Sequence, residues 1–216
     1  MKALELVPLL AESHISRGYV LTLGERYDEA ELEFNEAIRL NSNSFDAYYL
    51  YGRTSFARGE IERSEELFLK ASQIRREDYQ SLLLLGQSQR VLGKKDESQA
   101  ALREGISKAR KQLSIKPTDR RILSFASNSL LVLGEREEAY EWINRAMQLY
   151  PEDAGVLINA ACFFANDQNK EKALSILELA FSRGYGDIKW ISHDPDFDSI
   201  RDEPRFKALL SQKQLS

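Results

Sequence analysis

One spacing recurs along this chain: side chains of the same size stand 34 residues apart. Glycine follows it as Gly18, Gly52 and Gly86. We call a set of residues that stand at the same position of successive repeats a column. Three further columns each keep one size of side chain: Phe34, Phe68 and Leu102; Ala30, Ser64 and Ser98; Ala37, Ala71 and Gly105. A fixed period of this length is the signature of a repeat architecture, in which each unit buries its apolar face against its neighbours.

The repeat continues to the C-terminal part of the chain with one interruption. The spacing widens once to 41 residues, between Gly93 and Gly134, and then returns to 34, as between Ala139 and Ala173. The sequence therefore predicts five units, at residues 11–44, 45–78, 79–119, 120–153 and 154–187. Each unit reads as two amphipathic helices joined by a tight turn.

The columns resemble those of the tetratricopeptide repeat. The second and fourth units carry the resemblance through Tyr48, Gly52, Gly59, Phe68 and Ala71, and through Gly134, Ala139, Ala146 and Pro151. This resemblance implies an all-α fold, a right-handed superhelical solenoid of antiparallel helix pairs. It also implies a protein-interaction scaffold and not an enzyme.

Residues outside the regular units carry three further predictions. Residues 1–10 match the end of a repeat, so we expect the remnant second helix of an upstream unit. Either the chain is cut from a longer protein, which is the favoured interpretation, or this remnant helix acts as a short cap. The seven extra residues of the third unit equal two helical turns and lengthen its second helix. The basic residues of that extension are Lys108, Arg110, Lys111 and Lys116. They could form a ridge that faces a partner, but an extension without a binding role is the favoured interpretation.

The segment 188–216 departs from the repeat and is predicted to be a C-terminal cap. Its apolar residues can cover the last hairpin, and Pro195 and Pro204 stand where short helices begin. The segment resembles the ending of many bacterial tetratricopeptide arrays. Such arrays often form the C-terminal part of signalling proteins that carry a nucleotide cyclase, a Ser/Thr kinase or a DNA-binding regulator at the other end.

Candidate chemistry is sparse in the sequence, and we predict no catalytic residue, no cofactor and no metal. The acidic residues from Asp194 to Glu203 lack the spacing of a calcium loop and suit helix N-caps instead. His193 has no nucleophile in a matching arrangement, so a surface role is favoured. Cys162 is the one cysteine and lies beside apolar residues, which favours a packed thiol.

Charge and hydropathy narrow the range of partners. The net charge is −4, from 30 basic and 34 acidic residues, and no long basic block is present. We therefore expect neither nucleic acid nor a membrane as partner, and no apolar run is long enough to span a bilayer. The N-terminus lacks a secretory signal pattern, which predicts a cytoplasmic location.

With no candidate chemistry, the function that the sequence favours is the binding of a partner. In a repeat superhelix, the first helix of each unit lines the concave surface that can bind a peptide. The predicted peptide-binding residues are aromatic, basic or amide side chains of these helices: Tyr19, Tyr49, Arg53, Phe56, Gln87, Arg90, Arg121, Asn128 and Asn159. Tyrosine and arginine often dominate interface energetics, so a peptide with apolar anchors and some acidic character is expected. The partner is another protein or a missing domain of the same polypeptide.

Two alternatives accompany this prediction. Some first-helix residues, above all Leu83, Leu84 and Leu131, are expected to pack between units and not to face a ligand. The chain could also self-associate into a homodimer through apolar residues of its first segment, Leu4, Leu6 and Leu9. The carboxylate clamp of chaperone-binding tetratricopeptide domains is missing from this sequence, so binding of an acidic chaperone tail is not expected.

Overall fold

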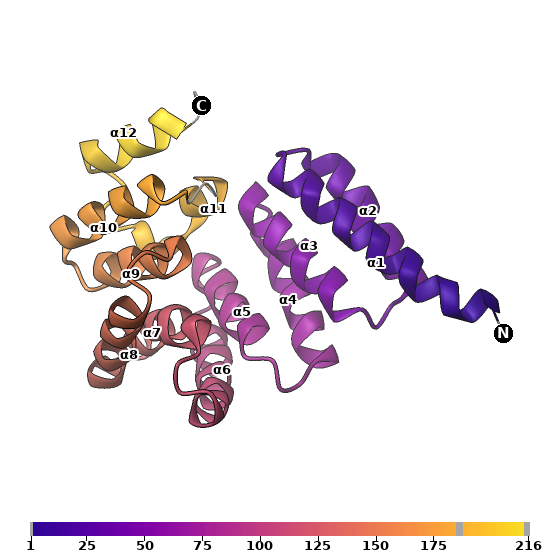
Figure 1. Cartoon of the computed structure of the whole chain (residues 1–216), viewed down its shortest axis with the longest axis horizontal. Coiled ribbons are helices and arrows are strands. Elements are labelled where there is room, and N and C mark those ends of the chain that lie inside the picture. The colour runs from indigo at the N-terminus through magenta and orange to yellow at the C-terminus, as the bar shows by residue number, and fades with distance from the viewer. Residues whose placement is uncertain (1, 185–187, 214–216) are drawn as a thin grey trace. The chain divides into compact units, whose positions relative to one another are not determined.

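The computed structural model describes residues 2–184 and 188–213, and side chains within 10–184, 188 and 190–211. Every regular element in this described part is helical (Figure 1). The chain divides into two compact units, Met1–Ala101 and Leu102–Ser216, with the boundary inside helix α6. The two units are described one at a time below.

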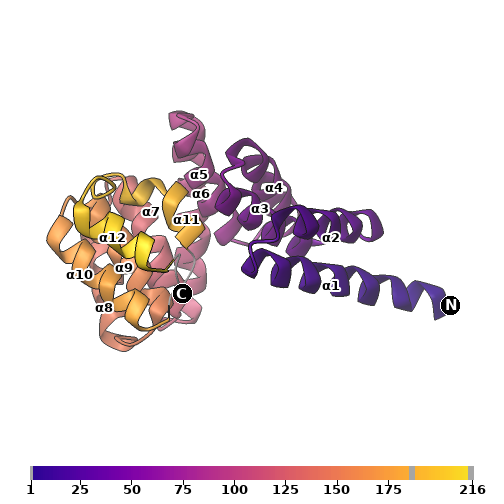
Figure 2. The ribbon, with the colours of Figure 1, turned by 90° about the horizontal axis from the view of Figure 1, so that it is seen from above.

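The first unit contains two complete helix pairs and most of a third. Its helices are α1 (Lys2–Leu23), α2 (Tyr27–Leu40), α3 (Phe45–Arg58), α4 (Ile61–Ile74), α5 (Gln80–Val91) and the start of α6 (Lys95–Ile115). Helix α1 packs on α2, and α3 packs on α4, as both views of the ribbon show (Figure 2). Each predicted repeat in this part of the chain thus contains one helical hairpin.

The second unit continues the pairing and adds a different C-terminal part. After the rest of α6 come a π-helical turn, η1 (Ile122–Ala126), and α7 (Ser127–Val132), α8 (Arg136–Leu149), α9 (Ala154–Asn166) and α10 (Lys170–Ser182). Then follow α11 (Ile188–His193), the 3-10 turn η2 (Pro195–Phe197) and α12 (Pro204–Lys213). Helix α12 contacts α10, and η2 contacts α9.

Small residues at the column of Gly18 and Gly52 let the two helices of a hairpin approach closely. A Cβ atom added to Gly18 would lie 2.9 Å from the Phe34 ring, and one added to Gly52 would lie 2.9 Å from the Phe68 ring. Both rings are fully buried. The large residue of one column therefore fills the space that the small residue of the other leaves open.

The turn between the two helices of a hairpin has a left-handed backbone in every repeat. Gly59, Gly93 and Gly134 have φ values of 87°, 73° and 83°. The equivalent residues of the first and fifth repeats are Glu25 and Gln168, with φ values of 55° and 61°. These two repeats thus keep the turn geometry without the glycine that most favours it.

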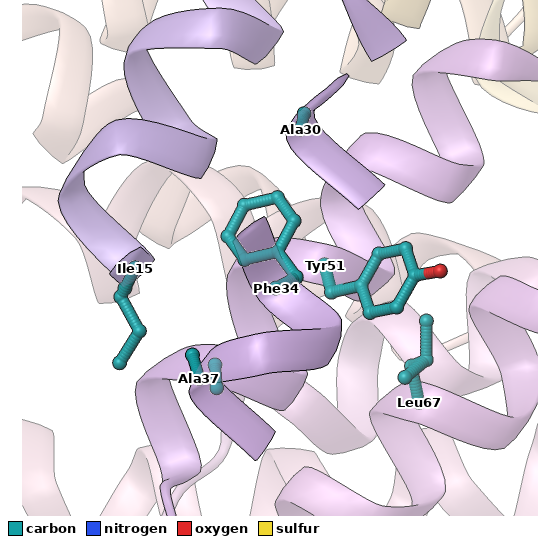
Figure 3. Close-up of a cluster of buried hydrophobic side chains, with 7 residues drawn as sticks. Ile15, Ala30, Phe34, Ala37, Tyr51 and Leu67 are labelled. Atoms are coloured by element: carbon teal, nitrogen blue, oxygen red, sulfur yellow. The ribbon is translucent and has the colours of Figure 1, made fainter. Parts of the chain in front are cut away.

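Hydrophobic packing joins consecutive hairpins in the first unit. Phe34 of α2 and Tyr51 of α3 stack with ring centroids 5.3 Å apart, and Leu67 of α4 lies in the same buried cluster (Figure 3). Ile15 and Ala37 complete it from the side of the first hairpin. The core is therefore continuous from one repeat to the next, as a stacked array requires.

Helix α1 differs from the prediction for the N-terminal segment. The sequence predicted that residues 1–10 form the separate second helix of an upstream repeat, but α1 runs from Lys2 to Leu23 without a break. Pro8 stands near this junction, but α1 continues through it, and no glycine lies between Pro8 and Gly18 to end the helix. The side chains of Leu4, Leu6 and Leu9 lie outside the described residues.

The lengthened helix of the third repeat is α6. It has 21 residues, compared with 14 in each of α2, α4 and α8. The difference of seven residues equals the widening of the repeat spacing and corresponds to about two helical turns, or roughly 10 Å.

Candidate functional site

In the first unit, the predicted peptide-binding residues lie on α1, α3 and α5. Tyr19 on α1 has 40% of its surface exposed. Tyr49 on α3 is half-buried; its ring stacks on Phe45 with centroids 5.4 Å apart, and its hydroxyl donates to Gln80 Oε1 on α5 at 3.1 Å. Tyr49 therefore presents one edge to solvent while it joins two successive first helices.

Polar side chains continue this surface along α3 and α5. Arg53, Gln87 and Arg90 are half-buried, with part of each side chain in contact with solvent. Phe56 is different, because it is completely buried in α3. Its assignment to a peptide-binding surface is corrected: Phe56 is a core residue, since a side chain without exposed surface cannot touch a ligand that binds to this structure.

In the second unit, Asn128 and Asn159 belong to a polar network between η1, α7 and α9. Asn128 Nδ2 donates to the main-chain oxygen of Asn159 at 2.9 Å, and Asn159 Nδ2 donates to Ser124 Oγ at 3.1 Å. Asn128 has only 6% of its surface exposed, and its Oδ1 has no hydrogen-bond partner among the described residues. Arg121, just before η1, is exposed.

The π-helical turn explains why polar side chains gather at this place. A π turn shifts main-chain carbonyls out of the regular hydrogen-bond ladder, so other donors must satisfy them. The carbonyl of Ser124 accepts from Ser127 Oγ at 2.8 Å and from Asn128 Nδ2 at 3.4 Å. Sequence periodicity gave no sign of this turn, because the columns of small and large residues pass through it unchanged.

Hydrogen bonds between successive first helices recur along the chain. Besides the Tyr49 bond and the Asn128 bond, the Thr22 and Thr54 hydroxyls lie 2.8 Å apart and join α1 to α3. Several residues that sequence reasoning placed on a binding surface therefore also join neighbouring repeats. Leu83 and Leu84 are buried, consistent with packing between repeats, and Leu131 is half-buried.

The amino-acid sequence of this chain is similar to known repeat proteins over part of its length. The family model described as tetratricopeptide repeat matches residues 3–78, which cover the first two hairpins. Residues 3–78 therefore carry tetratricopeptide repeats. One curated relative is a chloroplastic protein of Arabidopsis thaliana, 36% identical over 93 residues; the match covers 42% of this chain and 26% of the length of that relative.

Two solved structures, one of them of a tetratricopeptide protein, share the fold of this chain over nearly its full length. The protein TTC0263 of Thermus thermophilus has a TM-score of 0.62 and 15% identity, covering 95% of this chain and 100% of that one. PilF of Pseudomonas aeruginosa has a TM-score of 0.57 and 15% identity, covering 97% and 93%. At this level of identity the similarity establishes the fold alone.

The basic extension of α6 is partly neutralised by neighbouring acids. Lys108 Nζ lies 2.6 Å from Glu104, and Arg110 lies 2.6 Å from Glu138 and also pairs with Glu135. The hydrogen bond that Arg110 donates to Glu138, followed by the one that it donates to Glu135, holds the pKa of Arg110 above its ordinary value. These pairs favour the interpretation that the extension is structural.

The C-terminal segment brings Cys162 close to Asp194 and Asp196, a proximity that the sequence did not reveal. The donor atoms of these three buried side chains lie within 4.8 Å of one another. Both carboxylate oxygens of Asp194 already accept hydrogen bonds, from the Asp196 main-chain nitrogen at 2.9 Å and from Trp190 Nε1 at 3.1 Å. Asp194 caps η2, as its predicted role as a helix N-cap requires.

Two arginines of this segment form ion pairs. Arg201 pairs with Asp198 at 2.8 Å and also donates to the main-chain oxygens of Ser192 and Asp194. Arg205 pairs with Glu171 and Glu178 of α10, each at 2.9 Å. His193 is half-buried at the end of α11. Across the described residues, no helix combines the length and apolar character needed to cross a bilayer.

Proposed function

We propose that this chain binds a peptide segment, or a domain of its own longer polypeptide, on the surface formed by its first helices. The tetratricopeptide fold supports a protein-interaction scaffold in general, and proteins of this fold are generally not enzymes. The observation that carries the proposal is the partial exposure of Tyr49, Arg53 and Arg90 on α3 and α5, in the unit whose first two hairpins the family model matches.

The chemistry of this surface defines the ligand. Tyr19 and Tyr49 offer aromatic area with a polar edge, which favours apolar or aromatic anchors. Arg53 and Arg90 are always charged and can form paired hydrogen bonds with a carboxylate. We therefore propose an acidic peptide with one or two large apolar residues. Arg121, Asn128 and Asn159 of the second unit are proposed as a further contact region for such a peptide.

The cellular setting is proposed from the resemblance of the C-terminal segment to those of bacterial arrays. In that setting, the chain is the cytoplasmic interaction arm of a bacterial signalling or regulatory protein. The complete reading frame would test this, since a catalytic or DNA-binding domain in the same polypeptide is the expected result. A reading frame without such a domain would contradict the signalling context while leaving the peptide-binding proposal in place.

The binding proposal is tested with a library of acidic peptides that contain aromatic anchors, using fluorescence anisotropy. The variant Arg53→Glu should weaken binding by roughly 10-fold or more, since it places a carboxylate opposite an acidic ligand. Arg103→Glu is the matched control, because Arg103 is an exposed arginine on the second helix α6. Equal binding by both variants would show that α3 does not form the binding surface.

A further inference from the structure

The first hairpin carries a groove between α1 and α2. Its volume is about 480 Å³, and it is lined by Ser16, Arg17, Val20, Leu21, Arg26, Glu29, Leu32 and Glu33. Val20 is 66% exposed and Leu32 is 69% exposed, so the groove presents apolar side chains to solvent. Of the ten large hydrophobic residues exposed in the described part of the chain, five belong to α1 and α2.

The repeat shows what this face does in the other hairpins. Residues at the positions of Arg17, Val20 and Glu33 are buried in all later repeats: Tyr51, Leu85, Ala126 and Ala160; Thr54, Ser88, Ser129 and Phe163; Leu67, Ala101, Trp142 and Ile176. In the second hairpin, this face packs on α2 of the first, where Tyr51 stacks on Phe34. The groove of the first hairpin thus occupies the position at which a later repeat packs on its neighbour.

Charge distinguishes the first hairpin from the others at this position. Where the second hairpin has the buried apolar pair Tyr51 and Leu67, the first has Arg17 and Glu33, which form an ion pair at 2.9 Å. His14 lies 2.5 Å from the same Glu33 carboxylate. A purely apolar partner would bury this pair without replacing its hydration, which is unfavourable.

The charges of the groove are balanced and arranged in two rows. Arg17 lies on α1, whereas Glu29 and Glu33 lie on α2, and Arg26 precedes α2 and pairs with Glu29 at 2.5 Å. Two copies of this face related by a two-fold axis parallel to the helices would place α1 of one against α2 of the other. Such an arrangement requires self-complementary charge, because a face of one sign would repel its own copy.

We propose that this groove is the interface of a homodimer, in which the first hairpins of two copies pack with α1 against the partner's α2. Val20 and Leu32 form the apolar centre of the interface, and Arg17 of each copy faces Glu33 of the other across it. The proposal is independent of the peptide-binding surface on α3 and α5. It places self-association on described residues of the first hairpin, in contrast to the terminal leucines considered from sequence.

Sedimentation velocity over about 1 to 300 µM tests the proposal, a range that covers reversible dimers of modest affinity. The unmodified chain should shift from monomer to dimer. Leu32→Glu and Val20→Glu should each weaken dimerisation by roughly 10-fold or more, because each buries a charge at the apolar centre. The control is Ile115→Glu, at an α6 residue that is 79% exposed, and it should leave the dimer unchanged. Circular dichroism checks that each variant keeps its helicity.

A charge exchange tests the pairing of the two copies. Arg17→Glu alone and Glu33→Arg alone should each weaken self-association, because each places like charges opposite one another. An equimolar mixture of the two variants should form a heterodimer, since both contacts across the interface become attractive again. A heterodimer that forms no more tightly than either homodimer would overturn the proposed arrangement.

Two further outcomes would overturn the proposal. A chain that stays monomeric over the whole range would leave the groove to a helix of a different protein. A dimer that Leu32→Glu and Val20→Glu do not weaken would place self-association on another surface. Neither outcome affects the peptide-binding proposal, because its test uses α3 variants and an added peptide.

Discussion

The first and the last hairpin that the structure describes differ in how their end faces are covered. On the face of α1 and α2 that carries the groove, an ion pair between the exposed Arg17 and the half-buried Glu33 replaces the apolar residues that later repeats bury. Beside α9 and α10, a separate segment covers the hairpin with Ile191, Phe197, Ile200 and Phe206, each at most 1% exposed. The first hairpin keeps a face that can still receive a partner, whereas the last one has its partner in the same chain.

This difference predicts where the array is sensitive to mutation, and the capping segment should show the largest effect. Phe206 is 1% exposed, and its ring centroid lies 5.6 Å from that of Phe197. Phe206→Ala should lower the free energy of unfolding of the second unit by about 3–5 kcal/mol, since it leaves a cavity in a closed core. Both tryptophans, Trp142 and Trp190, belong to this unit, so their fluorescence during urea unfolding reports on it.

The control for the capping segment is Lys207→Ala, at the neighbouring exposed residue of α12, which pairs with Asp202. It should change the free energy of unfolding by less than about 0.5 kcal/mol. If Phe206→Ala had as small an effect as the control, the segment would not stabilise the hairpin that it covers, and the contrast between the two ends would fail.

The next effect concerns Tyr51, which occupies in the second hairpin the position of Arg17 in the first. Tyr51 is 3% exposed and stacks on Phe34. Tyr51→Ala should destabilise the first unit by about 3 kcal/mol, because it removes a buried ring from the junction between two hairpins. Thermal unfolding followed by circular dichroism measures the loss. Tyr19→Ala, at a 40% exposed position, should lower the midpoint far less; equal losses would show that the junction is not a core.

How far the sequence could predict this molecule depends on how local each feature is. The contact of Gly52 with the Phe68 ring recurs in the columns of the repeat, so spacing alone was enough to predict the hairpins. Residues that face a groove and residues that join repeats share the same helix positions. The sequence therefore could not separate the half-buried Arg53 from the fully buried Phe56.

Features that need contact between distant residues were out of reach. The π-helical turn at Ile122–Ala126 keeps the column pattern intact, and the Asn128 hydrogen bond spans 31 residues. The replacement of Tyr51 and Leu67 by Arg17 and Glu33 is visible in the columns. However, its meaning depends on knowing that these two columns face the preceding hairpin. Apart from Phe56, which is buried, the assignment of residues to a peptide-binding surface stays a prediction.

A smaller effect follows from the buried hydroxyl of Tyr51. Burial, as the main cause, raises the pKa of Tyr51 above its ordinary value near 10. In the unfolded chain the phenol ionises first, so this stabilisation is complete below about pH 10 and is lost as the pH rises above it. By pH 11 the first unit should lose about 1 kcal/mol that Tyr51→Phe would retain.

The measurement for this prediction is the urea midpoint between pH 8 and pH 11, compared between the unmodified chain and Tyr51→Phe. The pKa of Tyr140 is also raised, chiefly by its hydrogen bond to Asp167, so both proteins should lose some stability in the second unit at high pH. Only the difference between them reports on Tyr51. Parallel midpoint curves would mean that the Tyr51 hydroxyl is not held in its neutral form by the junction.

The smallest effect is expected on the open face of the first hairpin. The Arg17 side chain is 69% exposed, so its ion pair with Glu33 contributes little against solvent screening, and Arg17→Ala should change the free energy of unfolding by less than about 0.5 kcal/mol. The measurement is made near 1 µM, where the proposed dimer is dissociated.

The comparison with Tyr51→Ala is direct, since the two residues stand at the same position of successive repeats. A loss near 3 kcal/mol for both would mean that the ion pair stabilises the first hairpin as strongly as the buried ring stabilises the junction. The first hairpin would then be closed by its own charges, and its groove would have no need of a second copy.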